Sequence, residues 1–277
     1  MDLHNNTITF STCFYKVKSK FDITKYIEWI TNILSIVNHF NLVIYTNQET
    51  LSYFALKLTK SNQKRIRIII KPFNEFYTYK YSLFWINNHK RSNLMLHRHI
   101  DWKLNMLWNE KPFFVAETIR NKYFDTDLYG WIDIGYFRNR DCDLHTNFLS
   151  NWASPDAVAK LDNSLIHYGC VQKNLISYTK MAEEIRSHYK YKMIEPPTTK
   201  YEEIMFAGGF FILHKLFINL FTKLYNEKLQ YYFSNNYVIK DDQTIVQDII
   251  FTNQDLFEIH NENNIYDNWF MFQRILN

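Results

Sequence analysis

The sequence predicts an α/β fold built on a parallel sheet with crossover helices. Short runs rich in β-branched and aromatic residues alternate, in the first quarter of the chain, with segments of helical periodicity. Such alternation of strand and helix is the pattern of parallel strands that pack beneath their connecting helices. The chain has 277 residues, of which 47% are hydrophobic and 18% aromatic, so it can fill a large core and is not a disordered protein. Only 5 Gly and 5 Pro leave little room for a linker, and we expect one domain.

The amino-terminal elements follow one another closely. Residues 7–15, 41–47 and 65–70 are apolar runs typical of strands. Residues 21–40 carry aliphatic side chains along one side of a helix, and residues 51–58 predict a shorter helix. Ligands of parallel sheets bind beyond the carboxyl ends of the strands, so the residues at these ends are candidate ligand contacts.

The most informative segment is the apolar run at residues 128–138, which reads as a buried strand with one aspartate at its centre. A lone carboxylate among such neighbours is costly to bury without a partner. Asp133 therefore either caps a local turn, pairs with Arg138 just beyond the run, or holds a cation or sugar where the strand ends. Gly135 lets another group approach the backbone closely.

A lysine precedes a proline at a predicted helix start. Residues 100–110 have helical character, and Pro112 cannot continue that helix, since its ring also pushes Lys111 out of the helical region. Pro112 suits the first turn of a new helix. Lys111 would then stand at a helix amino terminus, where free N–H groups favour an anion. The alternative is a solvated charge.

The second half of the chain offers further candidates. Residues 164–171 read as a strand, and residues 204–221 as a buried strand that runs into an amphipathic helix. Gly208 and Gly209 indicate close backbone approach, either to a ligand or to a neighbouring strand.

Two consecutive aspartates, Asp241 and Asp242, precede a helix with an aliphatic face. One of them is accounted for as the helix N-cap, which leaves the other without a structural role.

Composition and charge bound the class of protein. The net charge of +4 is mild and suits a small anionic ligand as well as a nucleic acid. Three widely spaced cysteines without a CxxC pair argue against a disulfide framework or zinc knuckle and fit a reducing compartment. Residues 1–6 lack the features of a signal peptide, and the apolar stretch at 204–221 is interrupted by polar residues. We expect a soluble, cytoplasmic protein without a membrane span.

Four short patterns occur in a fixed order: Trp-Asn-Glu-Lys at 108–111, Trp-Ile-Asp-Ile-Gly at 131–135, Ala-Gly-Gly-Phe-Phe at 207–211, and Asp-Asp-Gln at 241–243. With this set the chain resembles the HtrL/YibB-like glycosyltransferases, over nearly its whole length from residue 8 to residue 273. Each pattern alone is weak, and the ordered set is fairly specific.

The resemblance implies a GT-A-like fold, a Rossmann-like, mixed and mostly parallel sheet that binds a nucleotide-sugar donor. It further implies a single domain over residues 1–277, with a donor-binding half at about 1–140 and an acceptor and catalytic half at about 141–277. The implied partners are a nucleotide sugar, foremost a UDP-sugar, and a carbohydrate or glycoprotein acceptor.

The resemblance also assigns a metal site to Asp133. In GT-A enzymes a DxD motif at a strand end usually binds Mn²⁺ or Mg²⁺, which bridges the donor diphosphate. Asp133 matches the first aspartate, but Gly135 stands at the third position, and one carboxylate holds such an ion weakly. A literal DxD at residues 125–127 precedes the strand and is typical of a turn. His260, after a strand-like segment, is a candidate to complete the metal site, or else an ordinary polar residue.

Other roles follow from the same resemblance. Lys111 and Arg138 would neutralise the diphosphate, and Asp242, with Asp241 beside it, would act as the catalytic carboxylate at the sugar or acceptor. From their positions at strand ends rather than from the resemblance, Tyr15 would stack on the base, and Thr12, Thr46 and Asn47 would form hydrogen bonds to the nucleoside. The other residues expected at the donor are Trp108, Gly208, Gly209 and Gln243.

The leading functional hypothesis is thus a nucleotide-sugar-dependent glycosyltransferase. One alternative is a GT-A-like protein that binds a sugar or a partner without turnover. The missing second aspartate of the DxD motif supports this alternative. Another is a basic nucleic-acid-binding protein that uses Lys64, Arg65, Arg67 and Lys71. Charged residues alternating along a strand are more often a solvated face, and no RRM, KH or zinc pattern is present, so we expect no nucleic-acid partner.

Overall fold

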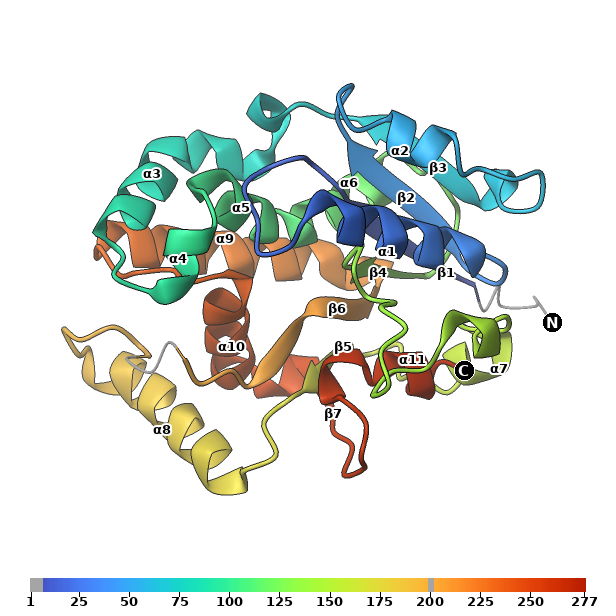
Figure 1. Ribbon diagram of the computed structural model, residues 1–277. Coiled ribbons are helices and arrows are strands. Elements are labelled where there is room, and N and C mark those ends of the chain that lie inside the picture. Colours follow the sequence, from blue (N-terminus) through green and yellow to red (C-terminus); the bar gives the residue numbers. More distant parts are fainter. Residues whose placement is uncertain (1–6, 199–201) are drawn as a thin grey trace.

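A single mixed sheet of seven strands runs through the described part of the protein (Figure 1). The computed structural model describes residues 7–198 and 202–277, so residues 1–6, on which the expectation about a signal peptide rests, lie outside it. The strand order is β3-β2-β1-β4-β6-β5-β7, and β6 is antiparallel to both its neighbours while the other pairs are parallel. The strands are β1 (Ile8–Cys13), β2 (Asn41–Thr46), β3 (Ile66–Ile70), β4 (Leu128–Ile132), β5 (Ile166–Cys170), β6 (Phe206–His214) and β7 (Phe257–His260).

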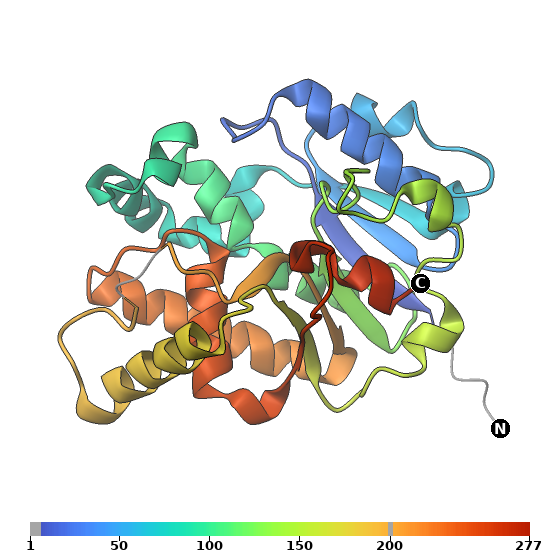
Figure 2. The same ribbon diagram turned by 60° about the horizontal axis from the view of Figure 1, so that its bottom comes forward.

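Helices cover both faces of the sheet, which confirms the predicted Rossmann-like α/β class with a mixed and mostly parallel sheet. Every residue of β1, β2 and β4 is buried, as expected for strands covered on both sides. In both views α3 and α4 lie at one end of the molecule and α7 at the other (Figures 1 and 2). The helices are α1 (Ile23–Ser35), α2 (Ser52–Ala55), α3 (Ser82–Arg91), α4 (Met95–His99), α5 (Trp102–Trp108), α6 (Lys111–Arg120), α7 (Pro155–Val158), α8 (Leu175–Tyr191), α9 (Ile218–Ser234), α10 (Asp242–Thr252) and α11 (Phe272–Ile275).

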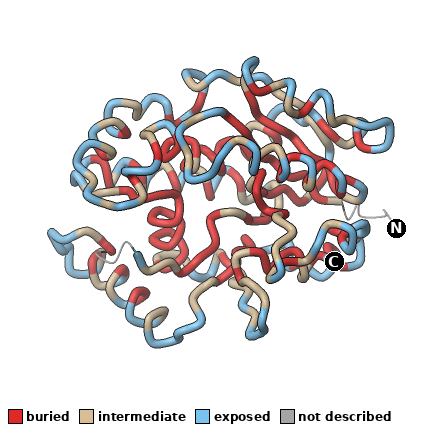
Figure 3. The backbone as a smooth tube through the Cα atoms, in the orientation of Figure 1, coloured by how far each residue is buried: buried red, intermediate tan, exposed pale blue. Residues whose placement is uncertain are grey.

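Two hydrophobic clusters fill the space between sheet and helices. Phe10 of β1 packs in the cluster that contains the buried faces of α1 and α11. Trp131 of β4 packs in the other, with buried residues of α6, α9 and α10. The helix α10 is buried over almost its whole length (Figure 3). The start of α10 is therefore held inside the molecule.

Several predicted boundaries differ from the structure. The strand expected at 128–138 ends at Ile132, so Asp133 comes directly after it. The helix expected at 100–110 begins at Trp102, because Asp101 caps it by accepting a hydrogen bond from the backbone N–H of Leu104. The next helix has Pro112 in its first turn, as predicted, but it begins at Lys111, which belongs to the helix and is not pushed out of the helical region by the proline.

The segment at 204–221 is a strand followed by a helix, as predicted, with a 3₁₀ turn between β6 and α9. Across residues 7–198 and 202–277, no helix combines the length and the apolar character that crossing a membrane requires. The assignment of the two halves of the chain to donor and acceptor stays a prediction.

Candidate active site

A cavity of about 380 Å³ opens at the carboxyl ends of β1 and β4. From β1 the chain builds β2 and β3 on one side, and it returns to add β4 on the other side. Ligands of α/β proteins bind at such a reversal of strand order, because the connections diverge there and leave a crevice. The cavity is lined by the loop after β1, the segment after β4, the first residues of β6 and the start of α10.

Lys111 lies at the base of this cavity and connects three distant segments. Its Nζ is 2.8 Å from Oδ2 of Asp242, 2.8 Å from the carbonyl oxygen of Gly208 and 3.1 Å from Oδ1 of Asp133. Burial by itself would lower the pKa of Lys111, but the charges of Asp133 and Asp242 outweigh this effect and raise it. The ammonium therefore stays charged although the side chain is buried.

Asp133 is held by its own strand and remains partly open to the cavity. Its Oδ1 accepts a hydrogen bond of 2.6 Å from Nε1 of Trp131, which is buried in β4. Its backbone N–H donates to the carbonyl oxygen of Gly209, at 2.8 Å. The side chain of Asp133 keeps 37% of its surface exposed, so the carboxylate is fixed in position and accessible to a ligand.

The two glycines of β6 lie against the two carboxylates. A Cβ atom on Gly208 would be 2.5 Å from Oδ2 of Asp242, and one on Gly209 would be 3.2 Å from Oδ2 of Asp133. The first distance is too short for any real side chain. Gly208 is thus required by the close approach of β6 to the start of α10.

Asp241 and Asp242 are both buried at the start of α10. Burial raises the pKa of Asp242 to about 7; Lys111 opposes this, while Asp241 and Asp133 add to it. Asp241 occupies the N-cap position, but its side chain makes no capping hydrogen bond to any described residue. Gln243 donates from Nε2 to the carbonyl oxygen of Phe206, at 3.1 Å. Two carboxylates thus contact one lysine, the carboxylate of Asp241 is adjacent in the sequence, and burial raises the pKa of Asp242 toward 7.

Arg138 lies at the cavity wall among aromatic rings. Its Nε donates to the carbonyl oxygen of Gly135 at 2.7 Å, and its guanidinium lies 4.6 Å from the ring centre of Trp29 and 5.1 Å from that of Phe270. A Cβ on Gly135 would be 2.6 Å from the ring of Trp29. Among the described residues, nothing accepts a hydrogen bond from the two terminal nitrogens of Arg138, so they are available to an anion.

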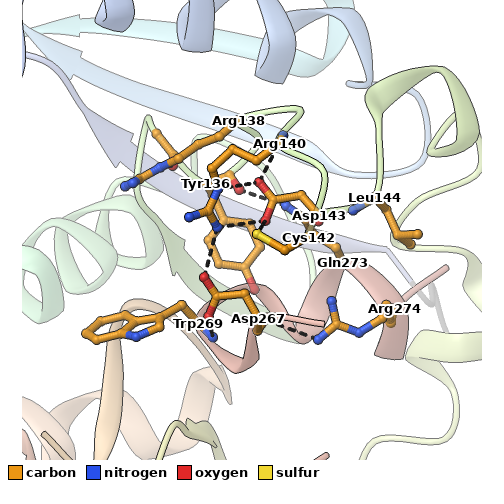
Figure 4. A network of polar contacts seen from close by, with 11 residues as sticks. Tyr136, Arg138, Arg140, Cys142, Asp143, Leu144, Asp267, Trp269, Gln273 and Arg274 are labelled. Atoms are coloured by element: carbon orange, nitrogen blue, oxygen red, sulfur yellow. Dashed lines mark hydrogen bonds and ion pairs between the residues drawn. The ribbon is translucent and has the colours of Figure 1, made fainter. Parts of the chain in front are cut away.

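A polar network joins the segment after β4 to the carboxyl-terminal segment (Figure 4). Arg140 donates to both carboxylate oxygens of Asp143, at 2.9 and 2.7 Å, and to Oδ2 of Asp267 at 2.9 Å. The residues that follow Asp267 include Trp269 and Phe270, which line the cavity. The network therefore fixes the wall against which Arg138 packs.

Most of the expected site residues are brought together at this cavity. The expected residues that line it are Tyr15, Trp108, Lys111, Asp133, Gly135, Arg138, Gly208, Gly209, Asp241, Asp242 and Gln243. Their roles toward a donor stay predictions.

The structure does not bring three of the expected nucleoside contacts to the cavity. Thr12 is fully buried, and Thr46 is buried with its hydroxyl donating to the carbonyl oxygen of Phe14 at 2.9 Å. Asn47 uses its Oδ1 in the turn after β2 and lines a separate hollow. Tyr15 lines the cavity, but its hydroxyl donates to the carbonyl oxygen of Lys71. Position at a strand end does not by itself show whether a side chain points into the core or into the cavity.

The residues expected to hold a divalent cation do not form one group. His260 is not among the residues that line the cavity with Asp133; its Nε2 lies 3.0 Å from Nδ1 of His167 instead. Gly135 offers no carboxylate, and Lys111 already contacts one oxygen of Asp133. Mg²⁺ and Mn²⁺ need several oxygen ligands, and a neighbouring ammonium repels them. The side chains around Asp133 suit a diphosphate that is neutralised by Lys111 better than they suit a metal ion.

Three lysines at the cavity were not predicted: Lys16, Lys20 and Lys240. Lys20 lies in the loop after β1, with its ammonium 5.3 Å from the ring centre of Trp108, and Lys240 directly precedes the two aspartates. Burial lowers the pKa of Lys20, and the charge of Asp241 acts in the opposite direction. The strand-end reasoning that selected Tyr15 also applies to the loop after it and would have included Lys20.

Comparison with known proteins gives one family model and many solved structures. A family described as "Bacterial protein of unknown function (HtrL_YibB)" matches residues 15–277. The structure of the galactosyltransferase LgtC with donor and acceptor sugar analogues matches with a TM-score of 0.45 and 14% identity, over 93% of this chain and 73% of that chain. An active-site mutant of LgtC matches with a TM-score of 0.45 and 11% identity, over 93% and 72%. No curated protein matches the sequence.

Proposed function

The chain belongs to the HtrL/YibB family, and we propose that it transfers a sugar from a nucleotide-sugar donor to an acceptor hydroxyl. The observation that carries the proposal is the ion pair of Lys111 with Asp133 and Asp242, at the base of a cavity where the strand order reverses. It places a fixed cation and two carboxylates next to one another in the crevice that α/β folds use for nucleotides.

The charge of the cavity suits a diphosphate. Among the described lining residues, five are cationic and three are acidic, an excess of two positive charges. Charge develops on the departing diphosphate in the transition state, so cations fixed in advance stabilise it more than they stabilise the bound donor. The cations are Lys16, Lys20, Lys111, Arg138 and Lys240, and the acids are Asp133, Asp241 and Asp242.

Arg138 and Lys111 have complementary tasks in this proposal. The guanidinium of Arg138 offers two nitrogens to phosphate oxygens, while Lys111 supplies a point charge deeper in the cavity. Asp133 positions Lys111, and its exposed oxygen accepts hydrogen bonds from the sugar.

Asp242 is the proposed catalytic carboxylate. The bond from the anomeric carbon to the diphosphate breaks, a bond to the acceptor oxygen forms, and the proton of the acceptor hydroxyl passes to a base. A carboxylate whose pKa is raised to about 7 is a stronger base than an ordinary aspartate, which suits this role. If the configuration is retained, the same carboxylate acts at the anomeric centre instead. Asp242, rather than Asp241, is preferred because it contacts Lys111.

The divalent cation implied by the resemblance remains a separate prediction, and no step above depends on it. The side chains around Asp133 do not favour such an ion, and in this proposal Lys111 neutralises the diphosphate in its place.

The test begins with a thermal-shift screen of UDP-, GDP-, CMP- and dTDP-sugars, with and without Mn²⁺. A ligand that binds only the folded protein raises Tm. Release of the nucleotide, which is a nucleoside diphosphate or, from a CMP-sugar, CMP, is then measured for the sugar that does so. We expect Asp242→Asn to lower that release by about a hundredfold or more, as loss of a general base does, while the donor still raises Tm.

Asp125→Asn is the matched control, since Asp125 is exposed, lies outside the cavity and begins the literal DxD sequence. It should release nucleoside diphosphate at the rate of the unaltered protein. Full activity of Asp133→Asn would remove Asp133 from the mechanism. Donor binding without any product, with or without Mn²⁺, would favour the alternative of a binding protein without turnover.

A further inference from the structure

A second group of chemically active side chains lies on the other side of β6, between β5 and β7. These strands are parallel, with His167 opposite Glu258 and Gly169 opposite His260. Side chains alternate along a strand, so Glu258 and His260 project from the same face of β7. The pairing of the strands places His167 beside them. None of the three residues lines the cavity.

The three side chains converge on one point. Nδ1 of His167 is 3.0 Å from Nε2 of His260 and 3.2 Å from Oε2 of Glu258, and the three ligand atoms all lie within 4.8 Å of one another. Two nitrogen ligands of a tetrahedral zinc ion, each about 2.0–2.1 Å from the metal, are separated by about 3.3 Å. The observed separations are close to that value.

A hydrogen bond on the far side of His167 orients its ring for this purpose. Nε2 of His167 is 3.0 Å from the carbonyl oxygen of Asp162, which can only accept, so Nε2 carries the proton of the neutral ring. Nδ1 then presents a lone pair toward Oε2 of Glu258. Two acceptors at 3.2 Å repel each other unless a proton or a cation lies with them. Metal-binding histidines are commonly oriented by such a carbonyl.

We propose that His167, Glu258 and His260 bind one divalent transition-metal ion of the Zn²⁺ class. Two imidazoles and one carboxylate favour zinc over Mg²⁺ or Ca²⁺, which prefer sites made only of oxygen. The ion joins the edge strand β7 to β5, and its binding therefore stabilises the folded protein.

The other group with metal-ligand spacing is Cys142, Asp143 and Asp267. Arg140 forms ion pairs with both of these aspartates, so a positive charge already stands beside them and disfavours a metal ion (Figure 4). We therefore use Cys142→Ser as a control variant, which tests whether Zn²⁺ binds at this second group instead.

The experiment uses the full chain, freed of metal by a chelator that is then removed. Zn²⁺ binding is measured by calorimetry, Co²⁺ binding by visible absorption, and Tm is followed against Zn²⁺ and Mg²⁺. We expect one Zn²⁺ per chain and a Tm that rises with Zn²⁺ but not with Mg²⁺.

Glu258→Gln and His260→Ala should each weaken Zn²⁺ binding by about tenfold or more. Both residues are only half-buried, so the metal-free variants are expected to fold, which circular dichroism checks. Cys142→Ser should bind as the unaltered protein does. The proposal is overturned if the unaltered protein binds no Zn²⁺, or if folded Glu258→Gln and His260→Ala bind it with unchanged affinity.

Discussion

At the scale of single residues, Lys111 decides whether the site exists. It is buried, and its partners come from the segment after β4, from β6 and from α10. Buried charges are tolerated when they are paired and hydrogen-bonded, and Lys111 satisfies both conditions. Without it, Asp133 and Asp242 face each other with no cation between them.

Replacing this lysine should therefore cost stability as well as donor binding. We expect Lys111→Met to lower the free energy of unfolding by about 3–5 kcal/mol, because it leaves buried carboxylates unpaired. Urea denaturation measures the loss. The double variant Lys111→Met with Asp242→Asn should regain part of the stability, since it removes one of those carboxylates. A single variant as stable as the unaltered protein would contradict the ion pairing described here.

At the scale of elements, the antiparallel strand β6 brings the site together. It enters between β4 and β5, and its first residues contact both the segment after β4 and the start of α10. Gly208 and Gly209 leave space for the carboxylates on either side. The loop and helix that carry these carboxylates are thus positioned by a strand with no side chain at the point of contact.

The two glycines offer a matched pair of variants. Gly208→Ala places a methyl group 2.5 Å from Asp242, so we expect it to displace that carboxylate, to cost about 1–3 kcal/mol and to abolish turnover. Gly209→Ala places one 3.2 Å from Asp133 and should have a smaller effect on both measures. Urea denaturation and nucleoside diphosphate release compare the two. Equal effects would show that the contact with Asp242 is not the critical one.

At the scale of the whole molecule, the buried acids set how stability depends on pH. Burial raises the pKa of Asp242 from 3.8 to about 7, and burial likewise raises that of Glu110 from 4.5 to about 7 despite hydrogen bonds from Thr78 and Tyr77. Between the ordinary pKa of each group and its raised value of about 7, the folded state holds a proton that the unfolded state has lost. Stability contributed by these groups is therefore full below about pH 4 and falls as pH rises toward about 7.

Asp242→Asn removes one of these groups and tests the direction. The Tm of the unaltered protein, minus that of the variant, should be largest at about pH 4 and should fall as pH rises to about 7. Thermal unfolding monitored by circular dichroism at several pH values measures this difference. A difference that grows with pH would mean that Lys111 lowers the pKa of Asp242 below its ordinary value.

Part of the site could be predicted because it rests on local chemistry. Asp133 stands out as a single acid in an apolar run, Pro112 marks a helix start beside Lys111, and Asp241 and Asp242 precede a helix with an aliphatic face. Each of these signals is contained in about ten neighbouring residues, which the structure holds in the predicted kinds of element.

Other parts of the site could not be predicted, because the positions of these side chains depend on contacts with residues far away in the sequence. Thr46 donates its hydroxyl to the carbonyl oxygen of Phe14, directly after the adjacent strand β1, rather than facing the cavity. His260 of β7 contacts His167 of β5, and no spacing in the sequence indicates that these two strands are neighbours. Lys20 and Lys240 reach the cavity from separate loops.

The sequence by itself determined the α/β class, a strand in the apolar run that carries Asp133, and helix starts beside Lys111 and Asp242, since periodicity and capping act over short distances. That the strand ends at Ile132, directly before Asp133, came from the structure. Only the tertiary structure decided that Lys111 reaches Gly208 and Asp242, which are 97 and 131 residues away along the chain. The physical reason is that a charge in the interior needs a partner in space, and the order of strands in the sheet decides which residues are near.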